Sequence, residues 1–296
     1  MLKKTLFFNN AYHLSIKYNQ LVITDKNTGE ESQRPVEDLG FVVLDDQQIT
    51  FTQSVVQHLA ANNVAVVFCD KKHHPASMLF HLDTHQTQTE RFRAQIEASK
   101  PLKKQLWKQT VKAKIRNQAA LLDFVGEEAE PLEYMARQVK SGDTTNQEAQ
   151  ASQHYWGYLF EEEFYRRRHG PPPNNLLNYG YTILRAAVAR ALMGSGLLPT
   201  LGIHHRNRYN SYCLADDIME PYRPYVDQKV WELVETGQGG QEDLSTELKS
   251  KLLDTLTCDI MIGDKKRPLM VGLSETTASL ARCFKGENRK IKYPEL

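Results

Sequence analysis

Residues 88–125, QTERFRAQIEASKPLKKQLWKQTVKAKIRNQAALLDFV, mark the place where the chain changes from β-type to helical patterning. Pro101 is compatible with the start of a helix or with a kink, and Gly126 predicts the end of the helical run. Before this stretch, short apolar runs alternate with Asn, Asp and Gly, which is typical of strands and turns. These runs are TLFFNN, HLSIKY, QLVITD, GFVVLD and VAVVFC. Helical apolar spacing interrupts them once, in FTQSVVQHLAANN at residues 51–63.

These patterns predict an α+β protein with two domains. The chain of 296 residues is long enough for two domains of typical size, about 100–200 residues each. We expect a β-strand-rich domain over residues 1–74, a linker at 75–90, and a larger all-α domain over residues 91–296.

The composition is that of an ordinary globular chain. No apolar stretch approaches the ~20 residues of a membrane span, and the start MLKKTLFFNNAYHL has no small-residue cleavage site. We therefore expect a cytoplasmic protein without a membrane partner. The four cysteines are widely spread, and no P-loop, dinucleotide-binding glycine pattern or Ser-His-Asp signature is present. The formal net charge of +1 argues against a uniformly basic nucleic-acid binder, although local charge governs contact with phosphates.

One local concentration of positive charge lies in the long helical stretch. The basic stripe consists of five cations at intervals of four residues, Lys100, Lys104, Lys108, Lys112 and Arg116. In a helix this interval places a cation every ~6 Å, which is comparable to the phosphate spacing along one DNA strand. The stripe indicates a DNA-binding surface, with a solvated helix face as the alternative. Lys103, Lys114 and the run at residues 166–169 add to the basic character.

Three separated segments carry the residue types of a metal-dependent phosphoryl-transfer site. They centre on Glu148, on the pair His204-His205, and on Asp217-x-x-Glu220. Carboxylate oxygens suit a hard divalent cation, and manganese tolerates an imidazole best. Such a metal lets a poor nucleophile attack a phosphodiester.

Each segment also has a purely structural interpretation. Glu148 lies near a predicted helix start, where a carboxylate favours the positive end of the helix. Asp217-x-x-Glu220 has the spacing of a capping box, which needs no metal. His204-His205 follow a helix stop, where adjacent loop histidines are often only solvated.

Taken together, the segments resemble a known family. The motifs are GDTTNQEAQASQHYW around Glu148, LNYGYTILRAAVARALMGSGLLPTLGIHH ending at His205, and LADDIMEPYRP around Glu220. Their order resembles that of the CRISPR-associated integrase, the first of the numbered Cas proteins, which inserts new spacers into a CRISPR array. The second and third motifs resemble its type II branch in particular, and the resemblance covers essentially the whole chain.

The resemblance implies a site that holds one Mg²⁺ or Mn²⁺. The implied metal ligands are Glu148, His205 and Glu220. The Gly-x-x-His pattern selects His205 over His204. The resemblance also implies Asp217 as an auxiliary acid, Arg223 as a basic residue, and Tyr179 as an aromatic residue near the site.

The function implied by the resemblance is strand transfer on double-stranded DNA. The 3′-hydroxyl ends of a protospacer duplex would attack backbone phosphodiesters at a CRISPR leader–repeat, with an associated endonuclease activity. The resemblance further implies a homodimer formed through the N-terminal domain. It also implies a heterohexamer-like complex with a small second adaptation protein, and other type II adaptation proteins as further partners. Two alternatives stay open, a simple metal-dependent DNA nuclease and a non-catalytic DNA-binding scaffold whose acids cap helices.

Overall fold

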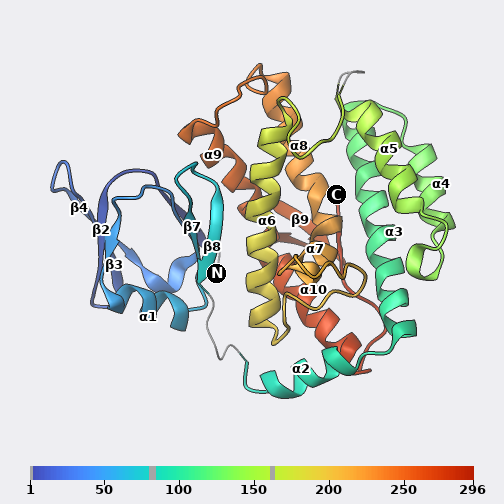
Figure 1. Ribbon diagram of the computed structural model, residues 1–296, viewed down its shortest axis with the longest axis horizontal. Helices are drawn as coiled ribbons and strands as arrows, with labels where there is room; N and C mark the ends of the chain where they lie inside the picture. Colours follow the sequence, from blue (N-terminus) through green and yellow to red (C-terminus); the bar gives the residue numbers. More distant parts are fainter. Residues whose placement is uncertain (1–2, 80–84, 161–163) are drawn as a thin grey trace. The chain divides into compact units, whose positions relative to one another are not determined.

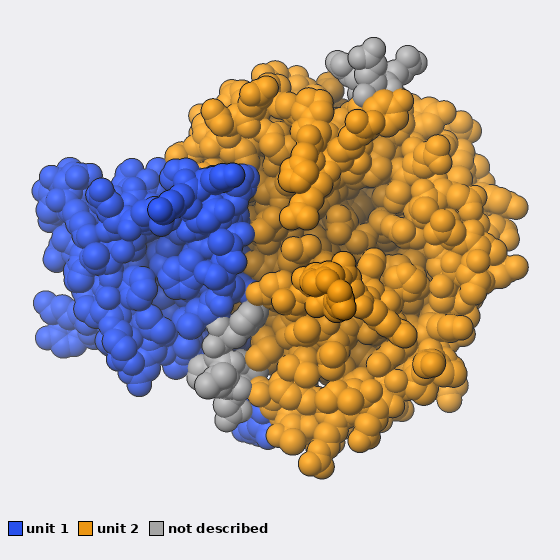
Figure 2. All heavy atoms as spheres, in the orientation of Figure 1, with its two compact units in different colours: residues 1–86 blue, residues 87–296 orange. Residues whose placement is uncertain are grey.

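The chain folds into a strand-rich unit and a larger helical unit. The computed structural model describes residues 3–79, 85–160 and 164–296. Residues 1–86 form unit 1 and residues 87–296 form unit 2, which Figure 2 shows in different colours. Unit 1 contains most of the described strands, and unit 2 is mostly helical (Figure 1), which confirms the predicted α+β class.

Unit 1 contains two four-stranded sheets. The first has the order β1 (Lys4–Phe8), β5 (Leu39–Leu44), β7 (Ala65–Cys69), β8 (Pro75–Leu79). In it, β1, β5 and β7 are parallel, and β8 is antiparallel to β7. The second has the order β4 (Glu31–Pro35), β3 (Gln20–Asp25), β2 (Tyr12–Lys17), β6 (Thr50–Phe51). Its β2–β3 hairpin turns at Tyr18 and Asn19, whose positive φ angles of 50° and 57° are typical of a type I′ turn.

The core of unit 1 is apolar. Helix α1 (Gln53–Ala61) confirms the single helix predicted among the strands, and its Val55 and Leu59 pack with the strand residues Leu14 and Val42. All six residues of β5 are buried because this strand lies between β1 and β7 inside its sheet.

The expected linker at residues 75–90 is wrong at both ends. Residues 75–79 form β8, which pairs with β7 through Leu79 and Val66, and helix α2 (Gln88–Glu97) begins before residue 90. Residues 80–84 lie outside the described part of the chain. Pro75 hid the strand from sequence reasoning, although proline is tolerated at the first residue of a strand. The boundary between the two units falls at residue 86.

Unit 2 is organised around the long helix α3 (Lys100–Val125). The Ser99 hydroxyl accepts a hydrogen bond from the Leu102 amide at 3.3 Å, and Pro101 occupies the first turn, so proline begins this helix and does not kink it. Gly126 ends the helix in the left-handed conformation, with a φ of 88°. The predicted end at Gly126 is therefore confirmed, and of the two alternatives left open for Pro101 the structure shows the helix start.

Further helices of unit 2 surround α3 and the long helix α6 (Asn174–Gly194) (Figure 1). They are α4 (Glu130–Gln138), α5 (Gln147–Leu159), α7 (Cys213–Met219), α8 (Arg223–Glu235), α9 (Thr246–Leu253) and α10 (Leu269–Phe284). Gly180 lets α6 approach α8 closely, because a Cβ atom at this position would lie 2.5 Å from Val226 Cγ1. No helix among the described residues is long and apolar enough to cross a membrane.

A small sheet adds strands to unit 2, which the sequence predicted as all-helical. Its order is β10 (Lys265–Pro268), β9 (Asp259–Ile262), β11 (Pro294–Glu295). Residues of β9 alternate between exposed and buried, as in a half-buried strand. A run of four residues is too short to be identified as a strand from its pattern. Its partner β11 follows α10 in the sequence, so the pairing is not local.

Candidate active site

Glu148 lies in the first turn of α5, at the edge of a site inside unit 2. The Asp143 carboxylate caps this helix by accepting hydrogen bonds from the amides of Gln147 at 2.9 Å and Glu148 at 3.0 Å. The Glu148 carboxylate is turned toward α3 and forms an ion pair with the Lys114 ammonium. Glu148 is therefore a first-turn residue, but Asp143 supplies the cap and Glu148 has a charged partner of its own.

Glu220 reaches the same ammonium from a different part of the chain. It begins the short 3-10 turn Glu220–Tyr222, which α3 holds in place because the Asn117 side chain donates to the Pro221 carbonyl at 2.7 Å. Lys114 Nζ lies 2.7 Å from Glu220 Oε2. One ammonium thus joins two carboxylates that are 72 positions apart in sequence, 148 and 220.

A second cation completes this cluster. Arg223 Nε lies 2.9 Å from Glu220 Oε1. Burial by itself raises the pKa of the Glu220 carboxyl, but the charges of Arg223 and Lys114 outweigh burial and lower this pKa below its ordinary value. Burial likewise opposes the charge of Lys114, yet Glu220 and Glu148 raise the pKa of this lysine. Both shifts favour the charged forms of Glu220 and Lys114. The cluster thus sets two carboxylates against two cations.

Asp217 organises the histidine loop. Its carboxylate accepts hydrogen bonds from the amides of Ile203 at 2.7 Å and His204 at 2.9 Å, and it lies 2.5 Å from His205 Nδ1. Gly202 makes this arrangement possible, because a Cβ atom there would lie 2.8 Å from Asp217 Oδ2. Asp217 is fully buried inside α7, so the capping-box interpretation of Asp217 and Glu220 is wrong.

The two adjacent histidines have different surroundings. A carboxylate accepts hydrogen bonds, so the proton of neutral His205 is on Nδ1 and its Nε2 is left as a donor to a metal. The hydrogen bond to Asp217 is also the main reason why the pKa of His205 is raised. His204 instead stacks on Trp107, with ring centroids 4.2 Å apart, and burial lowers its pKa. The geometry favours His205 as the ligand.

Tyr179 does not face this cluster, whereas Tyr181 does. The Tyr179 ring faces Lys249 of α9, at 6.0 Å from its ammonium. The Arg223 guanidinium lies 4.6 Å from the centroid of the Tyr181 ring. Two residues further along a helix point roughly the opposite way, so the aromatic residue beside the site is Tyr181 and not Tyr179.

Asp227 ties three helices together behind the site. Its carboxylate accepts hydrogen bonds from the hydroxyls of Tyr181 on α6 at 2.5 Å and Tyr155 on α5 at 2.9 Å. Burial raises the pKa of Asp227 to about 6, although both hydrogen bonds and Arg223 oppose this rise. Asp227 lies one turn after Arg223 on α8, and Tyr155 lies two turns after Glu148 on α5. The network therefore links the helices that carry these two site residues.

Sequence reasoning missed Lys114 as a site residue and placed it with the surface cations. Lys114 is only 7% exposed, whereas Lys100, Lys104 and Arg116 of the basic stripe are exposed. The available signal was its spacing with Trp107, Val111 and Gln118, which puts it on the buried face of α3. A lysine on such a face needs a buried acid. Tyr181 and Asp227 gave no comparable signal, because their partners come from other helices.

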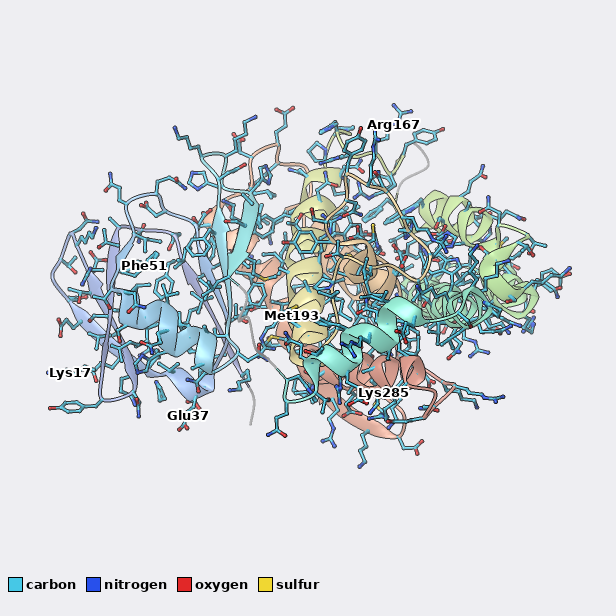
Figure 3. All side chains as sticks on the ribbon, turned by 60° about the horizontal axis from the view of Figure 1, so that its bottom comes forward. Lys17, Glu37, Phe51, Arg167, Met193 and Lys285 are labelled. Carbon is cyan, nitrogen blue, oxygen red and sulfur yellow. The ribbon has the colours of Figure 1, made fainter. Side chains whose placement is uncertain are left out.

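The surface cations remain a separate feature. The basic stripe lies on α3, where partial burial, and to a smaller extent repulsion from Lys108 and Arg116, lowers the pKa of Lys112. Within the run 166–169, Arg167 points outward from the molecule (Figure 3). Arg166 instead donates to the side chains of Asn174 at 3.0 Å and Asn178 at 2.7 Å, so it holds the start of α6.

The donor chemistry of the site fits a hard divalent cation. Glu148 and Glu220 offer carboxylate oxygens on either side of one point, and His205 offers an imidazole nitrogen whose orientation is fixed. Among the residues that the structure describes, no three His, Cys, Asp or Glu side chains are already arranged as a metal centre. The carboxylates are instead engaged with Lys114, so a metal ion and this ammonium would use the same oxygens.

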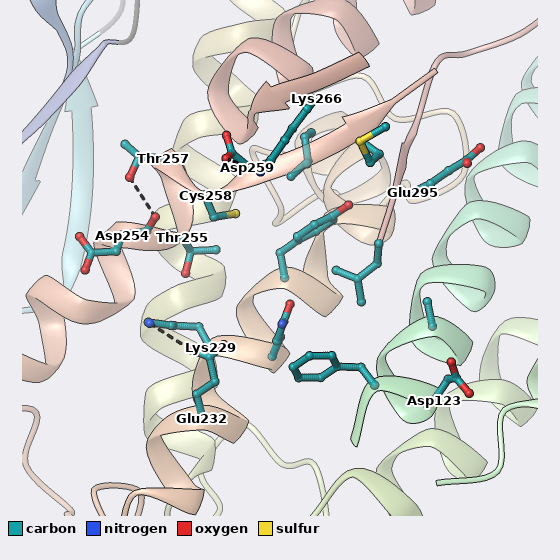
Figure 4. Close-up of a pocket in the computed structure, with 17 residues that line it drawn as sticks. Asp123, Lys229, Glu232, Asp254, Thr255, Thr257, Cys258, Asp259, Lys266 and Glu295 are labelled. Atoms are coloured by element: carbon teal, nitrogen blue, oxygen red, sulfur yellow. Dashed lines mark hydrogen bonds and ion pairs between the residues drawn. The ribbon is translucent and has the colours of Figure 1, made fainter. Parts of the chain in front are cut away.

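A cavity elsewhere in unit 2 lacks this combination of residues. A cavity of about 770 Å³ is lined by residues of α3, α8 and the small sheet (Figure 4). Its carboxylates are Asp123, Glu232, Asp254, Asp259 and Glu295. No histidine is among the described residues that line it, and Lys229 and Lys266 already pair with Glu232 and Asp259 at 3.0 Å. This wall has more acidic than basic side chains and would repel an anionic ligand, so the cluster around Lys114 is the better candidate site.

Solved structures share this fold. The chain superposes with a TM-score of 0.80 on a casposase bound to integration product, covering 97% of this chain and 92% of that one at 20% identity. With a Cas6-RT-Cas1–Cas2 complex the TM-score is 0.72, over 97% of this chain and 35% of that one, again at 20% identity. At this identity the likeness shows the fold alone, which this chain shares with the casposase and with part of the chain from the complex.

Sequence comparison gives the family. A model described as CRISPR associated protein Cas1 matches residues 6–263, and the chain belongs to this family. A relative named CRISPR-associated endonuclease Cas1, from Neisseria meningitidis serogroup C (strain 8013), is 35% identical over 99% of this chain and 96% of its own length. The resemblance drawn from the three sequence motifs is therefore confirmed.

Proposed function

We propose that this chain is a metal-dependent DNA integrase of CRISPR adaptation, of the type II branch, with an associated endonuclease activity. The observation that carries the proposal is the meeting of Glu148 and Glu220 at one ammonium, with the charge of Glu220 acting on His205, which Asp217 holds. Burying charges at this density costs free energy, and clusters of this kind with perturbed pKa values concentrate at functional sites, so this cluster is a candidate active site. Membership of the Cas1 family supports the same function.

The reaction would exchange one phosphodiester for another. A 3′-hydroxyl of the incoming duplex forms a new O–P bond at a phosphate of the leader–repeat. The existing P–O bond to the neighbouring 3′-oxygen breaks, and that oxygen leaves with a proton. Because one bond of the same type replaces another, no nucleotide triphosphate is needed and the reverse reaction, disintegration of branched DNA, also occurs. If water replaces the 3′-hydroxyl, the same site cleaves DNA.

The residues of the proposed site would have different roles in this reaction. Glu148, Glu220 and the Nε2 of His205 would hold one Mg²⁺ or Mn²⁺, which when bound polarises the phosphoryl oxygen and stabilises the developing charge. Asp217 fixes the tautomer and the direction of the His205 ring. Arg223, held against the Tyr181 ring, would add positive charge beside the phosphate.

The partners follow from the family and from the surface. The basic stripe would follow the backbone of the duplex, and the exposed Arg206 and Arg208 beside His205 would extend this surface toward the site. We also propose a homodimer formed through unit 1, and a heterohexamer-like complex with the small second adaptation protein, because the fold recurs in a Cas1–Cas2 complex. Other type II adaptation proteins and a cytoplasmic location complete the proposal.

A labelled branched DNA tests the proposal against its closest alternative. A simple nuclease is favoured by the name of the meningococcal relative, and it would give only shorter fragments. An integrase reseals the strand and releases the branch when Mg²⁺ or Mn²⁺ is present. Glu148→Ala and Glu220→Ala should each remove both resealing and cleavage while circular dichroism shows a folded protein. If both variants stay active, the acids are structural and the chain is a DNA-binding scaffold.

A further inference from the structure

Lys114 occupies an unusual position for a lysine. Its ammonium comes from the middle of α3, on the buried face of the helix, and 8% of its side chain is exposed. It contacts Glu148 Oε1 and lies 2.7 Å from Glu220 Oε2, so both oxygens face a single nitrogen. Lys112, two positions earlier, lies on the basic stripe and points to another side of the same helix.

The charges of the cluster balance only with this lysine in place. Two carboxylates face two cations, Lys114 and Arg223. If Lys114 stayed where it is, a divalent cation on the same carboxylates would leave these four groups with an excess of two positive charges. The Asp217 carboxylate, which holds His205, offsets one of them at most. An uncompensated buried charge is strongly unfavourable. Binding of a divalent cation therefore requires Lys114 either to move or to gain a new negative partner.

We propose that Lys114 is an exchangeable counter-ion that couples metal binding to DNA binding. Its ammonium holds Glu148 and Glu220 together and competes with a divalent cation for their oxygens. A phosphodiester at the site offers the released ammonium a new partner, on a flexible side chain that carries the charge as a compact point. DNA would then raise the metal affinity, and metal would raise the DNA affinity by the same factor. This inference rests on the proposed metal site, whose failure the experiment distinguishes from failure of the exchange.

The test measures Mn²⁺ binding to the full-length protein without DNA, by calorimetry or by the resonance signal of free Mn²⁺. The probe is the metal alone, so the result does not depend on catalysis. Lys114→Met keeps the apolar stem and removes the charge, and Lys114→Gln serves if the first variant fails to fold. Lys112→Met, which removes one charge from a more exposed side of the same helix, is the matched control.

We expect Lys114→Met to bind Mn²⁺ about 5–150-fold more tightly than the wild type, the usual range for coupling between ligands. Its melting temperature without metal should be lower than that of the wild type, and Mn²⁺ should restore it. A short duplex should tighten Mn²⁺ binding in the wild type and much less in Lys114→Met. Lys112→Met and Lys114→Arg should both bind Mn²⁺ as the wild type does.

The failures are distinguishable. If the folded Lys114→Met protein binds Mn²⁺ with the same or lower affinity than the wild type, the exchange is wrong and the proposed metal site stands. The other outcome is that neither the wild type nor Lys114→Met binds Mn²⁺ and that Glu148→Ala and Glu220→Ala give the same result. In that case the proposed metal site is wrong, and the proposed exchange is wrong too.

Discussion

The two units bury different kinds of side chain. The core cluster of unit 1 is aliphatic and aromatic, and its buried Asp45 pairs with His73 at 3.2 Å. Unit 2 buries many more charged groups, among them Lys114, Asp216, Asp217, Glu220, Asp227 and Lys249. Burial of a charge costs free energy, whereas apolar packing does not. The apolar core of unit 1 therefore contributes mainly to stability, and the buried charges of unit 2 indicate a functional role in addition.

Removal of unit 1 is the strongest test of this division. A protein that begins at residue 87 should keep the acids, His205 and Asp217, because all of them lie in unit 2. We expect it to be a monomer, since the sheet edges that a symmetric dimer would cover are gone. Paired, two-ended integration should be lost completely, whereas resealing of a single branch persists. Light scattering measures the first result, and a truncated protein that is still dimeric would contradict it.

Within unit 2, the histidine pair gives the next largest effect. His205→Ala should lower strand transfer at least ~100-fold, and Asp217→Ala about 10–100-fold, because Asp217 only holds the ligand in place. His204→Ala should cost far less, since this ring stacks on Trp107 and the residue reaches Asp217 through its backbone amide. Initial rates on branched DNA give all three values. An inactive His204→Ala beside an active His205→Ala would reverse the assignment.

Asp227 allows a test of the buried charge through pH. Its pKa rises from 3.8 to about 6 on folding, so the folded state holds the proton more tightly than the unfolded state. Below pH 3.8 both states are protonated. As pH rises from there through about 6, the protein loses stability that amounts to about 3 kcal/mol at most.

Asp227→Asn should remove this loss. Thermal melts at pH 4.5 and pH 7.5 give the shift in melting temperature between the two pH values for each protein. The difference between the shift in the wild type and the shift in the variant measures the loss due to Asp227. Asp254→Asn, at an exposed aspartate of the same unit, is the matched control and should change neither shift. Identical shifts in Asp227→Asn and the wild type would mean that Asp227 does not titrate in this range.

The basic stripe gives the smallest and most graded effect. Reversing Lys108 and Lys112 to Glu should weaken duplex binding for many sequences alike, because interactions with phosphates carry no base identity. The slope of log affinity against log salt should fall by ~0.9 for each phosphate that the variant no longer neutralises. Lys265→Glu with Lys290→Glu, at exposed positions elsewhere in unit 2, should leave the slope unchanged. An unchanged slope in the stripe variant as well would identify the stripe as a solvated face.

Local patterns in the sequence predicted much of the fold. The short apolar runs before residue 70 predicted β1, β2, β3, β5 and β7 of unit 1 but not β4 or β6, and the 3.6-residue spacing of residues 53–61 predicted α1. Ser99, Pro101 and Gly126 are local signals of helix ends, and the structure uses all three. Periodicity and capping depend on neighbours in sequence, so they can be read without knowing the tertiary structure. Local patterns did not predict the strand β8 or the small sheet, because the pairing of these strands depends on other segments of the chain.

For the site, the sequence by itself determined the residue types and the family: two acids, a histidine pair, an auxiliary acid and an arginine in a specific order. Only the tertiary structure decided which of them meet. It brings Glu148 and Glu220 to the ammonium of Lys114, it places Asp217 under the histidine loop, and it chooses Tyr181 over Tyr179. The physical reason is that such contacts join side chains from five helices, a 3-10 turn and a loop. Their distances depend on how those elements pack, and no local spacing in the chain encodes this packing.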